Sequence, residues 1–125
     1  MRSVISTPNA PTAVGPYSQA VRLGDLLFCS GQIPLRPDGS LETGDTKAQT
    51  RQVMENLKAV LSAAGCGFAD VVKATCFLVD MGDFAAFNEV YGAYFASEPP
   101  ARATVAVAAL PRGASVEVEL IARIP

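Results

Sequence analysis

The 125-residue sequence predicts one α+β domain, residues 1–125, with the element order ββαβαββ. Two observations predict this fold class. Short apolar stretches bounded by turn residues are typical of strands, and two central segments repeat apolar residues at helical spacing. Because pairs of strands flank a central helix, strand and helix, we expect one mixed sheet with both helices on a single face.

The N-terminal part is expected to hold a loop and a hairpin. Between Ser6 and Pro16, three prolines and one glycine exclude a regular helix and favour an extended loop. Strands are predicted over Ala20–Leu23 and Leu26–Gln32. Gly24-Asp25 between them is a two-residue turn of the kind that closes a hairpin.

The two helices are predicted from periodicity and end signals. The first spans Thr46–Ala64, with Thr46 and Gln49 as a capping box and Gly65 just past the C-terminal end. The second is capped by Asp83 and ends before Pro99. Its apolar stripe consists of Phe84, Phe87, Tyr91 and Tyr94.

The remaining strands are predicted over Val71–Asp80, Ala103–Ala109 and Ser115–Ile124. With both helices on one face, the other face of the sheet stays uncovered. That face carries apolar residues, Phe77, Val79 and Val107 among them, and only 18% of the chain is charged, below the average for soluble domains. We therefore expect this face to be buried against another copy of the chain.

Composition excludes several classes of function. The sequence has no histidine, which removes Ser-His-Asp and Cys-His catalysis and imidazole zinc sites. A net charge of −2 provides no basic field for nucleic acid or for an anionic membrane. Three cysteines at irregular spacing, without a signal-peptide or membrane-spanning apolar run, favour the reducing cytoplasm.

Arg102 is the most informative single residue. It precedes a run of small residues and has no acidic neighbour in the sequence. Its planar guanidinium suits bidentate capture of a carboxylate. An exposed arginine at a strand start, or an intersubunit salt bridge, would give the same pattern.

Glu117 and Glu119 lie on one side of the last predicted strand. A solvated outer face would explain both. If one of them faces a pocket, burial would raise its pKa and make it the natural acid or base in a chain without imidazole. No third ligand follows at a recognisable spacing, so no metal site is expected.

Several other residues have two interpretations each. Tyr17 either fills the core or lines a cleft, and Gly31 marks either a close approach to a ligand or a bulge. Asn88 interrupts the apolar stripe of the second helix, as a surface amide or as a polar tether. Cys29 and Cys76 are expected to be small core residues.

Together these residues resemble the RidA family, also called the YjgF or L-PSP family, over essentially the whole chain. The motifs that carry the resemblance are Gly15-Pro16-Tyr17-Ser18-Gln19, Ser30-Gly31-Gln32-Ile33-Pro34, Phe87-Asn88-Glu89-Val90-Tyr91, Pro100-Ala101-Arg102 and Val116-Glu117-Val118-Glu119. The resemblance implies a chorismate-mutase-like fold and a homotrimer with a β-barrel inside, helices outside and three clefts between subunits.

The resemblance also implies an activity that needs no cofactor. Family members with this arginine hydrolyse reactive enamines and imines, such as 2-aminoacrylate and 2-imino acids, to 2-keto acids and ammonia. By position, Arg102 would clamp the substrate carboxylate and Glu117 would activate the hydrolytic water. The cleft would be lined by Tyr17, Ser30, Gly31, Asn88 and Thr104. The family often has a cysteine at position 104, so Thr104 would keep a backbone contact and lose any thiol role.

Two other functions fit part of the pattern. A trimeric protein that binds a carboxylate metabolite without turnover would have the same arginine-lined cleft. An endoribonuclease of the L-PSP type is the third interpretation. The absent histidine and the acidic charge balance argue against RNA as a substrate.

Overall fold

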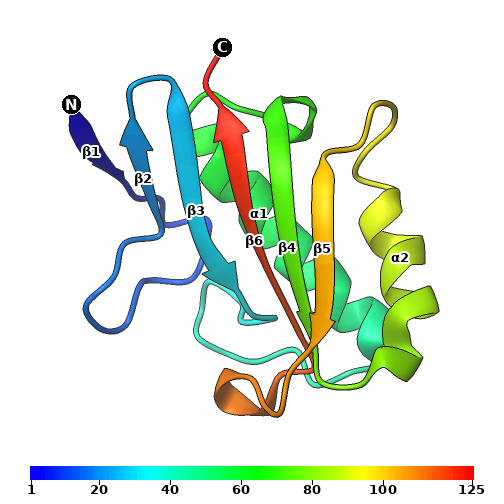
Figure 1. The fold of residues 1–125 in the computed structure, drawn as a ribbon. Coiled ribbons are helices and arrows are strands. Elements are labelled where there is room, and N and C mark those ends of the chain that lie inside the picture. The colour runs from blue at the N-terminus through cyan, green and yellow to red at the C-terminus, as the bar shows by residue number, and fades with distance from the viewer.

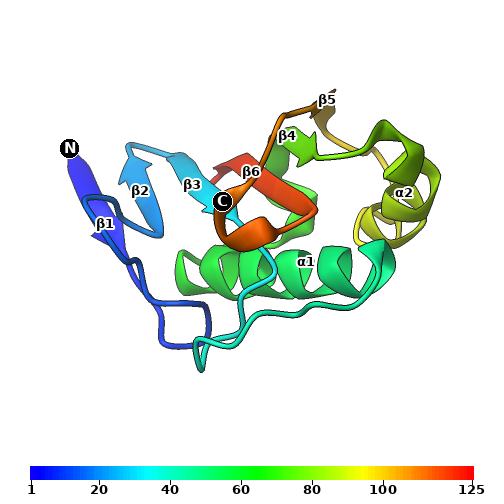
Figure 2. The same ribbon diagram turned by 90° about the horizontal axis from the view of Figure 1, so that it is seen from below.

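Six strands form one mixed sheet in the order β1-β2-β3-β6-β4-β5 in the computed structural model, which describes residues 1–125 (Figure 1). The elements are β1 (Arg2–Ile5), β2 (Ala20–Leu23), β3 (Leu26–Gln32), α1 (Thr46–Ala63), β4 (Val71–Leu78), α2 (Phe84–Gly92), β5 (Ala101–Ala106) and β6 (Val116–Arg123). All neighbouring strands are antiparallel except β4 and β5, which α2 connects as a parallel pair. Both helices lie on one side of the sheet (Figure 2), so the α+β prediction is confirmed.

Two strand predictions were wrong. The predicted strands did not include β1, a short edge strand whose four residues pair with β2 from Arg2 opposite Leu23 to Ile5 opposite Ala20. Its sequence has no strand pattern of its own, because the hairpin beside it provides the pairing. β5 spans Ala101–Ala106 and not Ala103–Ala109, because its parallel register with β4 begins at Ala101.

The N-cap of α1 lies one residue earlier than predicted. Asp45 is the N-cap, and its carboxylate accepts a hydrogen bond of 2.9 Å from the Ala48 N–H. The predicted Thr46–Gln49 capping box is therefore wrong. The Gln49 side chain instead accepts a bond from the Ser115 N–H and so ties α1 to the start of β6. Gly65 lies just past the helix with φ +77°, as predicted.

The start of α2 also differs in detail. Asp83 occupies the N-cap position but makes no capping hydrogen bond with its side chain. Asp80 instead caps the short 3-10 turn before the helix by accepting from the Gly82 N–H. Tyr94 lies beyond Gly92, where the helix ends. Neither helix of the structure combines the length and the apolarity needed to cross a membrane.

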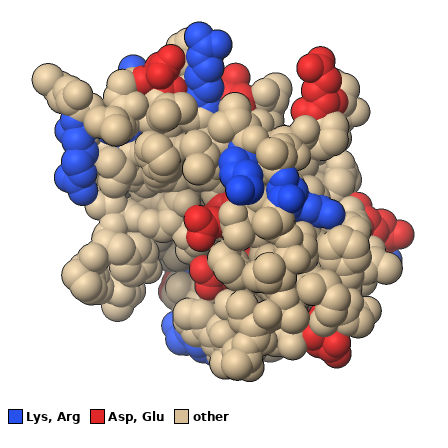
Figure 3. Space-filling model, in the orientation of Figure 1, with Lys and Arg blue, Asp and Glu red and all other residues tan.

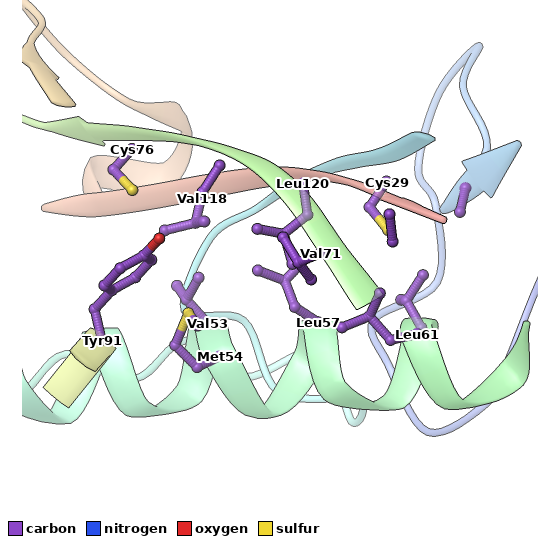
Figure 4. Close-up of a cluster of buried hydrophobic side chains, with 14 of the residues drawn as sticks. Cys29, Val53, Met54, Leu57, Leu61, Val71, Cys76, Tyr91, Val118 and Leu120 are labelled. Atoms are coloured by element: carbon purple, nitrogen blue, oxygen red, sulfur yellow. The ribbon is translucent and has the colours of Figure 1, made fainter. Parts of the chain in front are cut away.

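The hydrophobic core lies between the sheet and α1 (Figure 4). Alternate residues of β3, β4 and β6 meet the buried face of α1, which includes Val53, Leu57 and Leu61. Cys29 and Cys76 are buried in this core, as predicted, and burial raises their pKa values to about 12 and about 11. Both side chains are therefore small apolar residues and not thiolate nucleophiles.

The other face of the sheet is open and largely apolar. Phe28 on β3 lies opposite Ile121 on β6, and Phe77 on β4 lies opposite Val105 on β5. Phe28 is 41% exposed and Val105 is 43% exposed, so apolar side chains of both β3 and β5 are open to solvent on this face. Viewed from this side, the surface is mostly uncharged, and acidic groups near its centre border a hollow (Figure 3).

Candidate functional site

The end of β3 holds the first group of predicted site residues. The register with β6 shifts between Cys29 and Gln32, so Ser30 and Gly31 sit in an irregular stretch. Gly31 faces the Glu117 side chain of β6. A Cβ atom on Gly31 would lie only 2.2 Å from Glu117 Oε2, so the absence of a side chain leaves room for this carboxylate.

Ser30 and Tyr17 connect the proline-rich loop to this region. Ser30 Oγ donates a 2.6 Å hydrogen bond to the Ser18 carbonyl, and the Ser30 N–H donates to the Gln19 carbonyl. Tyr17, next to this anchored segment, is 54% exposed and lies with Gly31 in the wall of a pocket of about 300 Å³. Tyr17 therefore lines a cleft and does not fill the core.

Glu117 and Glu119 have different environments. Glu119 is exposed, whereas Glu117 is half-buried beside Gly31. Burial raises the pKa of Glu117 above its ordinary value, and the negative charge of Glu119 raises it further. Of the two carboxylates, Glu117 is thus the one whose surroundings favour the protonated form, which makes it the better candidate for a general acid or base.

A second group of residues surrounds Arg102 at the edge of the sheet, where β5 faces α2. Arg102 Nη1 donates a 2.7 Å hydrogen bond to Asn88 Oδ1. The guanidinium carbon lies 5.0 Å from the Tyr91 ring centroid and 5.4 Å from that of Phe84. Arg102 and Asn88 also line a pocket of about 370 Å³ together with Pro99 and Pro100.

Arg102 has no acidic partner within the chain. The three ion pairs of the structure join Arg36 with Glu42, Lys47 with Glu89, and Arg123 with Asp25. Arg102 is held by an amide oxygen and two aromatic rings, all of them neutral. Four of its five N–H groups remain free of Asn88, and its positive charge is not compensated. This arrangement suits an external carboxylate.

Phe84 and Tyr91 lie near Arg102 but were not predicted from the sequence to be site residues. Both were assigned to an apolar stripe of the second helix, with Asn88 as an interruption. The three residues follow the i, i+4, i+7 spacing of one helix face. A polar residue between two aromatic residues at this spacing was the available signal, and Asn88 is a polar tether.

Thr104 lies two residues after Arg102, opposite Cys76 of β4. Its side chain is half-buried, and Thr104 Oγ1 makes no hydrogen bond. The Tyr91 hydroxyl is likewise buried without a hydrogen-bond partner. Figure 4 shows the Tyr91 side chain pointing from α2 toward the sheet, with its hydroxyl near Cys76 and Val118.

The two groups lie on opposite faces of the sheet in one chain. Arg102 pairs with the buried Ala74 and is on the helix side, whereas Glu117 pairs with Phe77 on the open side. Glu117 is level with Val105, three residues along β5 from Arg102 and two strand spacings away. At about 3.3 Å per residue and about 4.8 Å per strand, their backbones are about 14 Å apart. A small ligand cannot contact both in a single chain.

The largest hollow of the structure, about 520 Å³, lies elsewhere, between the outer side of α1 and the N-terminal loop. Its lining includes Asn56, whose amide is already engaged by the backbone carbonyls of Ile33 and Leu35. None of the candidate residues lies in its wall. Each of the two smaller pockets holds two candidate residues, Tyr17 and Gly31 in one and Asn88 and Arg102 in the other.

Known proteins resemble this chain over nearly its whole length. The family model described as Endoribonuclease L-PSP matches residues 7–124. Protein DfrA of Myxococcus xanthus is 57% identical over 124 residues, 97% of this chain and 95% of that protein. The 2-iminobutanoate/2-iminopropanoate deaminase of Mus musculus is 50% identical over 123 residues, 98% of this chain and 91% of the mouse protein.

A solved structure shares the fold over nearly the whole chain. E. coli TdcF with bound serine has 42% sequence identity and a TM-score of 0.94, and the match covers 98% of this chain and 99% of that chain. The family match, the relatives and the shared fold all agree with the five motifs that the sequence carries. The chain therefore belongs to the RidA family, also called the YjgF or L-PSP family.

Proposed function

We propose that this protein is a hydrolytic deaminase that converts reactive enamines and 2-imino acids, such as 2-aminoacrylate and its imine tautomer, to 2-keto acids and ammonia. The observation that carries the proposal is the uncompensated Arg102 guanidinium, held by neutral groups in a pocket. It suits the carboxylate that all these substrates share. The name of the mouse relative, an imine deaminase at 50% identity, supports the same reaction.

The proposed site forms between copies of the chain. Arg102 and Glu117 lie on opposite faces of one sheet, so the Arg102 group of one copy would meet the Glu117 group of another. The exposed apolar face, with Phe28 and Val105, supports an assembly that covers it. We propose the homotrimer that the family resemblance implies, located in the reducing cytoplasm, with a small imino acid and not nucleic acid as its partner.

In the proposed mechanism, Arg102 binds the substrate carboxylate and presents the imine carbon to a water molecule beside Glu117. The substrate reacts as the protonated imine. The Glu117 carboxylate accepts a proton from the attacking water as the water oxygen bonds to the imine carbon, which gives a neutral carbinolamine. Glu117 then returns the proton to the amine nitrogen. The carbinolamine hydroxyl gives its proton to the Glu117 carboxylate as the C–N bond breaks, so the carbonyl forms and ammonia leaves. Ammonia then takes this proton from Glu117 and is released as ammonium. Tyr17 and Gly31, which share the wall of one pocket, would border the cleft between copies in which this occurs.

A coupled assay tests the proposal. An amino-acid oxidase generates the imine, and keto-acid formation is compared with the uncatalysed rate. Arg102→Ala should lower kcat/KM by about 10- to 150-fold, the equivalent of losing a charge-assisted hydrogen bond of about 1.5–3 kcal/mol. Arg51→Ala, which removes an exposed arginine on α1, is the control. Unchanged keto-acid formation in Arg102→Ala would overturn the assignment.

A protein that binds carboxylates without turnover is the second candidate. The serine found in E. coli TdcF favours it, because that ligand carries a carboxylate but no imine. Such a protein would bind a keto acid or amino acid through Arg102 and leave the imine to decay at its background rate. The coupled assay and a binding titration with the same protein therefore separate the two candidates.

A further inference from the structure

We infer that Phe84 and Tyr91 are positioning residues that, with Asn88, hold the Arg102 guanidinium in its carboxylate-binding orientation. We call these three residues of α2 the arginine cradle. The inference rests on the proposed function, because it assigns how the carboxylate-binding arginine is prepared for its substrate. It adds two aromatic residues that would never touch the substrate's reacting atoms.

The geometry of the cradle comes from one face of α2. The three side chains are spaced by four and then three residues, so they form one row along the helix. Arg102 on β5 lies over this row. Its guanidinium carbon is 5.4 Å from the Phe84 centroid and 5.0 Å from the Tyr91 centroid, both within the range of a cation–π contact. Its Nη1 is fixed by Asn88 Oδ1.

A neutral cradle has a consequence that a salt bridge would not have. A carboxylate partner would orient Arg102 equally well, but it would occupy the fork of N–H donors and cancel the charge. Aromatic faces attract the cation through their quadrupole and take no N–H group. Phe84 and Tyr91 therefore restrict the long arginine side chain while its donors stay available to a ligand.

The aromatic packing behind the cradle keeps the Tyr91 ring in place. Tyr91 is only 5% exposed, and its ring stacks on Phe87 at 5.3 Å and packs against Phe95 at 4.9 Å between centroids. The ring that supports the guanidinium is thus anchored in the interior. Because less rotamer freedom is lost when the ligand binds, such a cradle increases affinity through preorganisation.

The test compares variants that remove a ring with variants that keep it. Phe84→Leu and Tyr91→Leu remove one aromatic face each, and Phe84→Tyr and Tyr91→Phe retain it. Each assembled protein is titrated with 2-ketobutyrate, a keto acid of the product class, and assayed for imine turnover. Phe68→Leu is the matched control, since it removes an aromatic ring from the same cluster without touching Arg102.

We expect the leucine variants to raise the Kd for 2-ketobutyrate and the KM for the imine about threefold to tenfold, with kcat within twofold of wild type. The aromatic replacements should restore both constants, and Phe68→Leu should leave them unchanged. A wild-type Kd in Phe84→Leu and Tyr91→Leu would overturn the inference. So would equal losses in all three leucine variants, because these would reflect only general loosening of the fold.

The same measurements separate this inference from the proposed function. If wild-type protein binds 2-ketobutyrate but does not accelerate imine hydrolysis, the deaminase proposal fails. In that case, weaker 2-ketobutyrate binding by the leucine variants would still support the cradle. If the wild-type protein accelerates imine hydrolysis while the leucine variants keep both constants, the deaminase proposal stands and the cradle fails.

Discussion

Replacing Gly31 by alanine should remove most of the activity while leaving the fold intact. The added Cβ would lie 2.2 Å from Glu117 Oε2, 2.9 Å from its Cδ and 3.2 Å from its Cγ. An ordinary contact begins at 3.4 Å, so the carboxylate oxygen must retreat by about 1.2 Å. A displacement of about 1 Å at a reacting group costs on the order of 10²-fold in rate. We therefore expect kcat to fall by about that factor.

Stability should change little in this variant, for two reasons. Gly31 does not have a left-handed φ, so alanine fits its backbone conformation without strain. All three close atoms belong to the Glu117 side chain, which can rotate away. The free energy of unfolding should stay within about 1 kcal/mol of wild type.

The assay is imine turnover in the amino-acid oxidase system, together with the Kd for 2-ketobutyrate and the thermal midpoint. Gly67→Ala is the control, because Gly67 also has an extended backbone and no atom lies within 4 Å of its added Cβ. In the double variant Gly31→Ala/Glu117→Asp, the shorter aspartate leaves room for the added Cβ. Glu117→Asp should therefore lower kcat by a smaller factor in the Gly31→Ala background than in wild type. Wild-type kcat in Gly31→Ala would refute the reasoning, as would a fold that no longer assembles.

Three further results are expected. Because the Glu119 charge raises the pKa of Glu117, Glu119→Gln should shift the acidic limb of the pH profile of kcat/KM to lower pH. If the limb does not move, it reports the titration of a group other than Glu117. Burial favours the protonated form of Glu117 in the folded state, so folding stability falls as pH rises through its raised pKa. Glu117→Gln should thus be more stable than wild type at pH 8 and similar to it at pH 4, as measured by denaturant unfolding. Tyr91→Phe removes a buried hydroxyl without a partner, and should leave the denaturation midpoint equal or higher.

Local signals in the sequence predicted most of the fold. The Gly24-Asp25 turn and the alternation around it give β2 and β3 with the observed bounds. Gly65 likewise marks the end of α1. β1 could not be predicted in this way, because its residues become a strand only through pairing with β2. The shift of β5 to Ala101 has the same origin in pairing with β4.

The candidate site could also be predicted only in part from the sequence. The sequence shows that Arg102 has no acidic neighbour along the chain. In the structure, Arg102 also forms no ion pair with an acidic side chain from elsewhere in the chain. The contact between Gly31 and Glu117 depends on how β6 lies beside β3, which no local pattern encodes. The sequence likewise does not show that Arg102 and Glu117 face opposite sides of the sheet, because this follows from strand order and register.

The separation of Arg102 and Glu117 has a consequence for how variants behave together. In the proposed assembly, each active site draws its arginine from one polypeptide and its glutamate from another. An isolated newly made chain would be inert, and activity would be lost on dilution to monomers. Two inactive variants, Arg102→Ala and Glu117→Gln, would complement each other when mixed and reassembled, because some interfaces would unite an intact arginine with an intact glutamate. Catalytic activity would then be a property of the interface between two chains and not of a single chain.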